Sequence, residues 1–235
     1  TELMLPAFGV PLFGDCGVAG GSRLRGTSLR VPADISSAAF FLVGASVAPG
    51  SDLTLTHVGT NPTRTGVLNI LRLMGADITL LNERTVGGEP VADIRVRHAP
   101  LRGIDIPLAQ VPLAIDEFPA LFIAAACAEG ETVLRGAEEL RVKESDRIAA
   151  MAEGLTTLGV QNQVLEDGIV ICGGDMGGGE VRTYQDHRIA MSFAIAGLRC
   201  SAPVTVLDCD HVATSFPGFD SLAASCGLGI AVQGD

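Results

Sequence analysis

The chain has 235 residues, of which 47% are hydrophobic, and a formal net charge of −11 at pH 7. A chain of this length can bury one large core or two small ones. The acidic balance argues against binding to nucleic acid or to a membrane surface, because both need a basic face on the protein. A site for an anionic ligand would have to be a local exception.

The six cysteines form no CxxC pair, and the sequence shows no secretory leader. We therefore expect free thiols in a protein of the reducing cytoplasm. No apolar run reaches the roughly 18 residues that a membrane span needs, so we expect a soluble protein. The four histidines form no ligand cluster, and we expect neither a metal nor another cofactor.

The first 32 residues predict the end of a structural unit and not its start. Leu3, Leu5 and Phe8 follow a helical pattern that stops at Gly9, and short strands are expected toward residues 28–31. This order matches the second half of the repeated units described next, without a first half. We infer that the chain is a piece of a longer one.

Three segments share one pattern, in which an aspartate precedes an almost wholly apolar run. The aspartates are Asp34, Asp116 and Asp186. The runs predict helices over 35–47, 118–128 and 189–198, and a helix that is apolar on every side has to be buried. Aspartate is a preferred residue at helix starts, so each carboxylate is expected to cap its helix.

Each apolar run is followed by a strand and then by an amphipathic helix that ends at a glycine. The glycines are Gly75, Gly159 and Gly227, at nearly the same distance from the aspartate in all three units. Such regular spacing indicates an internal repeat. The repeat predicts an α/β (α+β) fold with one inner and one outer helix in each unit. The expected strands are 53–57, 131–135 and 203–207, with 76–81 and 91–96 as a pair and a second pair at 164 and 169–172.

The most charged stretch is residues 141–147 (Arg-Val-Lys-Glu-Ser-Asp-Arg), directly before an amphipathic helix that Ser145 is expected to cap. The start of a helix favours an anion, and Lys143 and Arg147 add full charges. Arg188 stands at the start of another predicted helix, so an anion site with carboxylates beside it is expected on one face. The alternative is a solvated cluster of ion pairs, which is the usual fate of a charge run.

These motifs resemble the family of 5-enolpyruvylshikimate-3-phosphate (EPSP) synthases, also called 3-phosphoshikimate 1-carboxyvinyltransferases. The resemblance runs in order through nearly all 235 residues. It implies an inside-out α/β barrel of three βαβαββ units around buried parallel helices. It also implies that 33–235 form the C-terminal domain and that 1–32 are a remnant of the N-terminal domain. The matching stretches are 34–38, 141–147, 186–191 and 215–217.

The resemblance further implies an activity and partners. The family transfers the enolpyruvyl group of phosphoenolpyruvate to the 5-hydroxyl of shikimate 3-phosphate, in the biosynthesis of aromatic amino acids. Asp116 takes the position of the proton acceptor and Glu144 that of the proton donor. Two carboxyl groups can fill these roles if their surroundings separate their pKa values.

Further residues match the family's substrate contacts. Arg147 and Arg188 take the positions that clamp phosphoenolpyruvate, and guanidinium groups suit its phosphate and carboxylate. Lys143 falls where the family contacts shikimate 3-phosphate, which Asp116 also reaches. His187 is expected to hydrogen-bond to substrate or to Glu144.

Two positions depart from the family. Glu139 stands where many members have an asparagine, and an acid there should repel the shikimate phosphate. Thr214 stands where some members have a lysine, and no role is assigned to it. The N-terminal domain, which supplies the other wall of the cleft, is missing. The chain alone is therefore expected to have little or no turnover.

Two alternative functions remain open, and several other residues are expected to have no part in the site. The alternatives are a domain like that of the UDP-N-acetylglucosamine enolpyruvyl transferase, which shares the architecture as RNA 3′-phosphate cyclase does, or a non-catalytic module of the same fold. The glycines within 173–179 predict a flexible loop and not a nucleotide site. Residues 61–64 are expected to cap an outer helix, and His57, His98 and His211 are expected to have no catalytic role.

Overall fold

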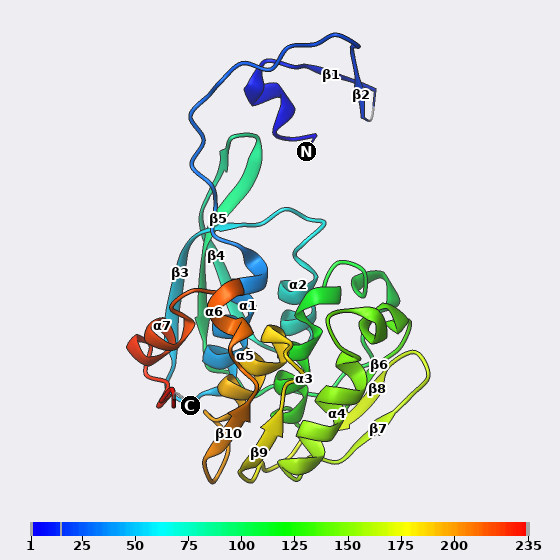
Figure 1. The fold of residues 1–235 in the computed structure, drawn as a ribbon, viewed down its shortest axis with the longest axis vertical. Coiled ribbons are helices and arrows are strands. Elements are labelled where there is room, and N and C mark those ends of the chain that lie inside the picture. Colours follow the sequence, from blue (N-terminus) through cyan, green and yellow to red (C-terminus); the bar gives the residue numbers. More distant parts are fainter. Residues whose placement is uncertain (1, 15, 234–235) are drawn as a thin grey trace.

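Three apolar helices form the centre of the molecule. In the computed structural model, which describes residues 2–14 and 16–233, each of these helices contacts the other two (Figure 1). They are α1 (Ile35–Val47), α3 (Phe118–Ala126) and α5 (His187–Ala196). All nine residues of α3 are buried, as expected for a helix without a polar side. The three predicted helices are confirmed, with boundaries that shift by up to two residues.

Two of the three predicted caps are confirmed. Asp34 accepts a hydrogen bond from the Ser37 main-chain N–H at 2.9 Å, and Asp186 accepts one from the Arg188 N–H at 2.9 Å. The prediction for Asp116 is wrong, because this residue lies in a 3-10 turn, η3 (Ile115–Glu117), that runs directly into α3. No extended residue precedes α3, and Pro119 in its first turn lacks the N–H group that a cap would satisfy.

Two antiparallel sheets and one parallel strand pair surround the central helices. The first sheet has the order β3-β5-β4 and the second the order β6-β8-β7. In each sheet, the strand that comes last in the chain lies in the middle. The strands are β3 (Asp52–Gly59), β4 (Asp77–Val86), β5 (Glu89–Arg97), β6 (Glu131–Leu134), β7 (Asn162–Val164) and β8 (Ile169–Cys172). The strands predicted for these two sheets are confirmed, and β3, β4 and β5 extend beyond the expected ranges.

The third pair corrects one prediction. Strand β9 (Gly179–Arg182) pairs in parallel with β10 (Val204–Leu207). Residues 173–179 were expected to be a loop, but the last of these glycines begins β9. Val181, two residues after Gly179, is buried and lies opposite Val206. Burial of this side chain extends the sheet into a stretch whose glycines are typical of a loop.

The outer helices end as the glycines predict. They are α2 (Gly66–Leu73), α4 (Arg147–Thr157) and α7 (Phe219–Ser225), with the short α6 (His211–Ser215) before α7. The φ angles of Gly75, Gly159 and Gly227 are 99°, 86° and 99°. Residues with a side chain rarely adopt such angles, so glycine at these positions lets the chain leave the helix without strain.

The starts of two outer helices differ from the prediction. Asp146, and not Ser145, caps α4 by accepting a hydrogen bond from the Ala149 N–H at 3.0 Å. The Ser145 hydroxyl instead donates to Asp186 at 3.1 Å. Asn61 does not cap α2, which begins only at Gly66; its side chain is hydrogen-bonded within its own turn and to Glu89.

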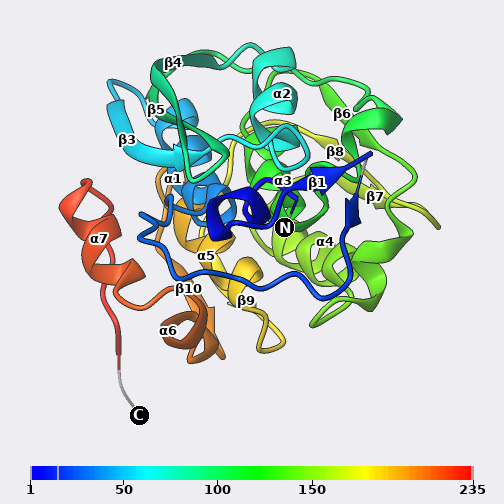
Figure 2. The same cartoon turned by 90° about the horizontal axis from the view of Figure 1, so that it is seen from above.

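The N-terminal segment lies beyond one end of the helical core, next to the tip of the β4–β5 hairpin (Figure 1). Seen from above, it passes over the central helices (Figure 2). It contains η1 (Leu5–Phe8), β1 (Leu12–Phe13) and β2 (Gly17–Val18). The strands expected toward 28–31 are absent, since residues 22–32 form no regular structure.

Two properties of the whole described chain bear on its class. Within residues 2–14 and 16–233, no helix combines the length and the apolar character that a membrane crossing demands. All six cysteines are free thiols.

Two short 3-10 turns, η2 (Leu108–Gln110) and η4 (Glu138–Val142), lie in the connections before and after α3.

The contact of α4 with α5 at Gly154 yields a stability prediction. A Cβ atom at this position would lie 2.1 Å from Cζ of Phe193, whose ring is fully buried and cannot move aside. We expect Gly154→Ala to lower the free energy of unfolding by about 1–3 kcal/mol through overpacking, although alanine favours helix. Denaturant unfolding measures this change.

The matched control is Gly174→Ala, because a Cβ atom there meets nothing within 4 Å. Equal stability of the two alanine variants would contradict the packing described between α4 and α5.

Candidate functional site

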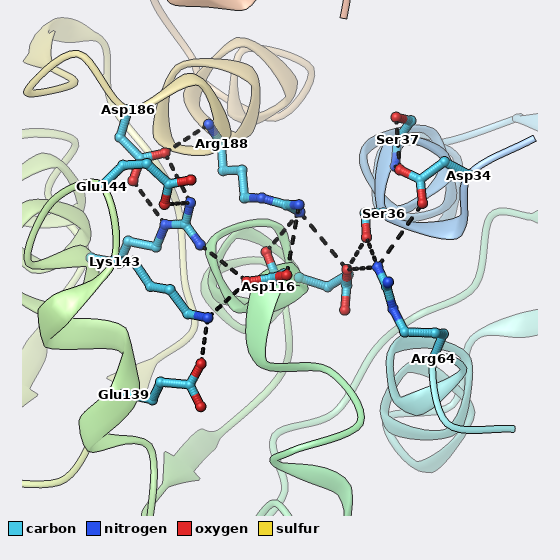
Figure 3. A network of polar contacts seen from close by, with 12 residues as sticks. Asp34, Ser36, Ser37, Arg64, Asp116, Glu139, Lys143, Glu144, Asp186 and Arg188 are labelled. Atoms are coloured by element: carbon cyan, nitrogen blue, oxygen red, sulfur yellow. Dashed lines mark hydrogen bonds and ion pairs between the residues drawn. The ribbon is translucent and has the colours of Figure 1, made fainter. Parts of the chain in front are cut away.

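Five of the six predicted site residues are linked by ion pairs in one cluster, although they come from three separate parts of the chain. Figure 3 labels four of them, Asp116, Lys143, Glu144 and Arg188. Asp116 lies in η3, directly before α3. The segment after η4 supplies Lys143 and Glu144, and Arg147 is the first residue of α4. Arg188 is the second residue of α5. The starts of three helices therefore bring these groups together.

Arg147 is the central cation of this cluster, and its side chain is 0% exposed. Its Nε donates to Asp186 at 2.8 Å, and its Nη2 donates to Glu144 at 2.6 Å. Its Nη1 lies 3.5 Å from Asp116 but forms no hydrogen bond within the described part of the chain. A buried guanidinium is stable only where carboxylates offset its loss of water, and here three of them do so.

Asp186 has a larger role than the sequence indicated. Besides capping α5, it accepts hydrogen bonds from Arg147 and Ser145. Burial raises the pKa of Asp186, but the hydrogen bond and charge of Arg147 outweigh this, so its pKa is lowered. The aspartate therefore stays ionised and fixes the orientation of Arg147. Sequence reasoning missed this contact because the two residues lie in different units of the repeat.

Three cations surround the carboxylate of Asp116. Lys143 Nζ lies 3.3 Å away, Arg147 Nη1 3.5 Å and Arg188 Nη2 3.9 Å. Burial raises the pKa of Asp116, but the charges of Arg188, Lys143 and Arg147 together lower it below its ordinary value. Asp116 is therefore an ionised carboxylate with three cationic side chains within 3.9 Å.

The other predicted site residues are more exposed than Arg147. Glu144 is about half-exposed, whereas Lys143 and Arg188 are 21% and 17% exposed. His187, the first residue of α5, is partly buried, and its pKa is lowered by this burial and by the charge of Arg188. The lowered pKa favours the neutral imidazole, which can both donate and accept a hydrogen bond.

The two departures from the family pattern differ in their surroundings. Glu139 forms an ion pair with Lys143, four residues later. This contact raises the pKa of Lys143, so the acid neutralises a neighbouring cation. Thr214 lies exposed in α6, and no role follows from its position.

A second polar group adjoins the cluster on the other side of Asp116. Its members Ser36 and Arg64 are labelled in Figure 3, opposite Lys143 and Glu144. They meet the buried carboxylate of Glu117, the residue after Asp116. Sequence reasoning missed this group, and the only signal was a second acid at the start of an otherwise apolar helix.

The arrangement suits the recognition of an anion. Lys143 and Arg188 reach the surface of the cluster, where a ligand could contact them, while Arg147 lies beneath. Guanidinium and ammonium groups at helix starts bind phosphate and carboxylate groups well. Asp116 is held ionised beside them, so one site combines anion binding with a carboxylate that can accept a proton.

Known proteins are similar to this sequence across its whole length. The family model described as EPSP synthase (3-phosphoshikimate 1-carboxyvinyltransferase) matches residues 1–222. The 3-phosphoshikimate 1-carboxyvinyltransferase of Alkalilimnicola ehrlichii is 64% identical over 240 residues, and that of Halorhodospira halophila is 65% identical over 238 residues. Both alignments cover 100% of this chain but only 53% and 54% of the relatives. The chain thus spans about half the length of the curated relatives that it matches.

Solved structures agree with these matches. An EPSP synthase from Acinetobacter baumannii has a TM-score of 0.95 at 56% identity, over 100% of this chain and 55% of that chain. The enolpyruvyl transferase NikO from Streptomyces tendae, with a TM-score of 0.71 at 18% identity over 94% of this chain and 51% of that chain, shows a shared fold only. Since the family model covers all but the last 13 residues of the 235, the chain belongs to the EPSP synthase family.

Proposed function

We propose that this chain supplies one half of an active site that transfers the enolpyruvyl group of phosphoenolpyruvate to shikimate 3-phosphate. The observation that carries the proposal is the position of Asp116, within 3.9 Å of the cationic groups of Lys143, Arg147 and Arg188. Family membership supports the reaction. It also favours this reaction over the UDP-N-acetylglucosamine alternative raised by the sequence.

The proposal includes a division of the protein into domains. Residues 33–235 form one domain of three βαβαββ units, and residues 1–32 belong to a second domain. The similar strand orders β3-β5-β4 and β6-β8-β7 support the repeat. The remaining half of the relatives' length corresponds to the second domain, which we expect to complete the site as the protein's partner in catalysis. We expect the reaction to take place in the cytoplasm.

The electrostatics of Asp116 suit a proton acceptor that is activated by substrate. Without substrate, the three cations keep its pKa low, so it is ionised but only weakly basic. Anionic substrates at Lys143 and Arg188 would share the positive charge and raise the proton affinity of Asp116. The carboxylate would then take the proton of the 5-hydroxyl as that oxygen attacks the enol carbon.

The second proton transfer requires an acid near the same carbon. Glu144 lies at the exposed edge of the cluster and is hydrogen-bonded to Arg147. We propose that it protonates the methylene carbon of the enol phosphate when the bond to the hydroxyl oxygen forms. The Glu144 carboxylate formed in this step then takes a proton back from the same carbon, and the double bond is restored as phosphate leaves with the proton that Asp116 gained.

The two arginines differ in their access to ligand. Arg188 is partly exposed, and we propose that it contacts phosphoenolpyruvate directly while His187 beside it adds a hydrogen bond. Arg147 is fully buried, so direct contact with ligand requires movement of a neighbouring carboxylate. In the structure described here, Arg147 orients the two acids Asp116 and Glu144.

The first test compares the chain with a full-length hybrid, made from this chain and the remaining half of a relative of the family. We expect the chain alone to release no phosphate above background from the two substrates, because half of the binding and stabilising groups are missing. The hybrid should release phosphate, and glyphosate, the family's inhibitor, should slow this release.

Turnover by the chain alone at the rate of the hybrid would contradict the proposed division of the site. A hybrid that unfolds cooperatively but has no activity would contradict the proposed function.

The second test changes Asp116 in the hybrid. We expect Asp116→Asn to lower kcat on the order of 100- to 10,000-fold, because the amide cannot accept the proton. Steady-state measurement of phosphate release checks this. Asp175→Asn is the matched control, since Asp175 is exposed and lies outside the cluster. If the Asp116 variant keeps the activity of the control, Asp116 is not the proton acceptor.

A further inference from the structure

Glu117 is an acid that the mechanism above does not use, although it follows Asp116 directly. Its side chain is 2% exposed, which is unusual because a buried carboxylate loses its hydration. Burial raises the pKa of Glu117, while the hydrogen bond from Ser36 and the charges of Arg188 and Arg64 act in the opposite direction. Retaining an acid at this position requires compensating partners.

The partners of Glu117 come from three other parts of the chain. The Ser36 hydroxyl, in the first turn of α1, donates a hydrogen bond to its Oε1. Arg64, before α2, donates to the same Ser36 oxygen at 2.7 Å and lies 4.0 Å from Oε1. On the side of the candidate site, Arg188 Nη1 lies 3.8 Å from Oε1. Glu117 therefore stands between one arginine of the site and one outside it.

The contacts of Arg188 show what Glu117 does for it. Nη1 of Arg188 donates to the main-chain oxygen of Asp116 at 3.0 Å and faces Glu117. Among the residues that the structure describes, Nη2 has only a long contact of 3.9 Å, with the Asp116 carboxylate. One edge of the guanidinium is thus fixed, and the other is left for a ligand. A fixed guanidinium loses less entropy when it binds a phosphate or carboxylate.

We propose that Glu117 is a positioning residue that holds the Arg188 guanidinium for phosphoenolpyruvate, and that Ser36 and Arg64 keep Glu117 in place. The proposal rests on the proposed function. It assigns a role to the first unit of the repeat, whose α1 otherwise contributes no group to the site. Ser36 and Arg64 of the first unit hold Glu117, and Glu117 in turn holds Arg188 of the third unit.

Steady-state kinetics of the full-length hybrid test this role. In Glu117→Gln the amide can still accept the hydrogen bond from Ser36, but the charge that attracts Arg188 is lost. We expect the KM for phosphoenolpyruvate to rise on the order of 10-fold, within the range that misplaced binding groups cause. The KM for shikimate 3-phosphate should stay within about twofold, and Glu117→Asp should recover part of the loss.

Two further comparisons separate positioning from folding. Arg64→Met should raise the same KM by a smaller factor and add nothing in a Glu117→Gln background, because both changes act through one contact. The matched controls are Glu129→Gln, beyond the other end of α3, and Arg72→Met, at the end of α2; both residues are exposed. Neither control should change either KM.

A direct measurement of Arg188 makes the test independent of turnover. The NMR signal of its Nε–Hε group, assigned by its loss in Arg188→Lys, should exchange faster with water in Glu117→Gln than in Glu129→Gln. Unchanged exchange, additive effects of the two substitutions, or an equal rise of both KM values would overturn the positioning role.

The kinetics of Arg188→Ala separate a failure of the proposed function from a failure of the role of Glu117. If Arg188→Ala leaves the KM for phosphoenolpyruvate unchanged in an active hybrid, the assignment of Arg188 as a substrate contact is wrong, and the inference falls with it. If Arg188→Ala raises this KM and Glu117→Gln does not, only the role of Glu117 is wrong.

Discussion

The buried guanidinium of Arg147 is the interaction on which the rest of the site depends. It is bonded to Asp186 and Glu144 and lies against Asp116. An arginine without water is costly unless its charge is offset, so the structure is stable only when these acids converge on it. They belong to three different segments of the chain. The ion pairs therefore define the relative positions of α4, α5 and the turn before α3, and these positions define the surface offered to a ligand.

Much of the fold could be predicted because each feature has a local physical cause. The central helices were predicted from residues that are apolar on all sides, which only burial explains. The ends of the outer helices were predicted from Gly75, Gly159 and Gly227, whose positive φ angles other residues avoid. Predictions failed where two local preferences competed. Asp146 displaced Ser145 as a cap, and a 3-10 turn left Asp116 free to face the cations instead of the helix.

The candidate site could be predicted in composition but not in geometry. The charged residues of 141–147 and 186–188 were identified from their sequence, yet charge runs are normally solvated. Nothing local in the sequence indicated that Arg147 is wholly buried or that Asp186 binds it. The contact of Ser36 with Glu117 spans 81 positions. Such pairs arise from the packing of helices against one another, which periodicity and capping preferences do not encode.

The site is assembled from residues at or just before the first turns of helices. The rest of α1, α3 and α5 fills the interior with mostly aliphatic and aromatic side chains. Interior packing tolerates exchange among apolar residues of similar volume. Exchange of apolar residues along these helices during evolution therefore need not disturb the polar groups at their N-terminal ends. Changes of those polar groups likewise need not disturb the packing of the interior. A scaffold with this separation can diverge far in sequence and keep its shape, as the 18% identical NikO structure illustrates.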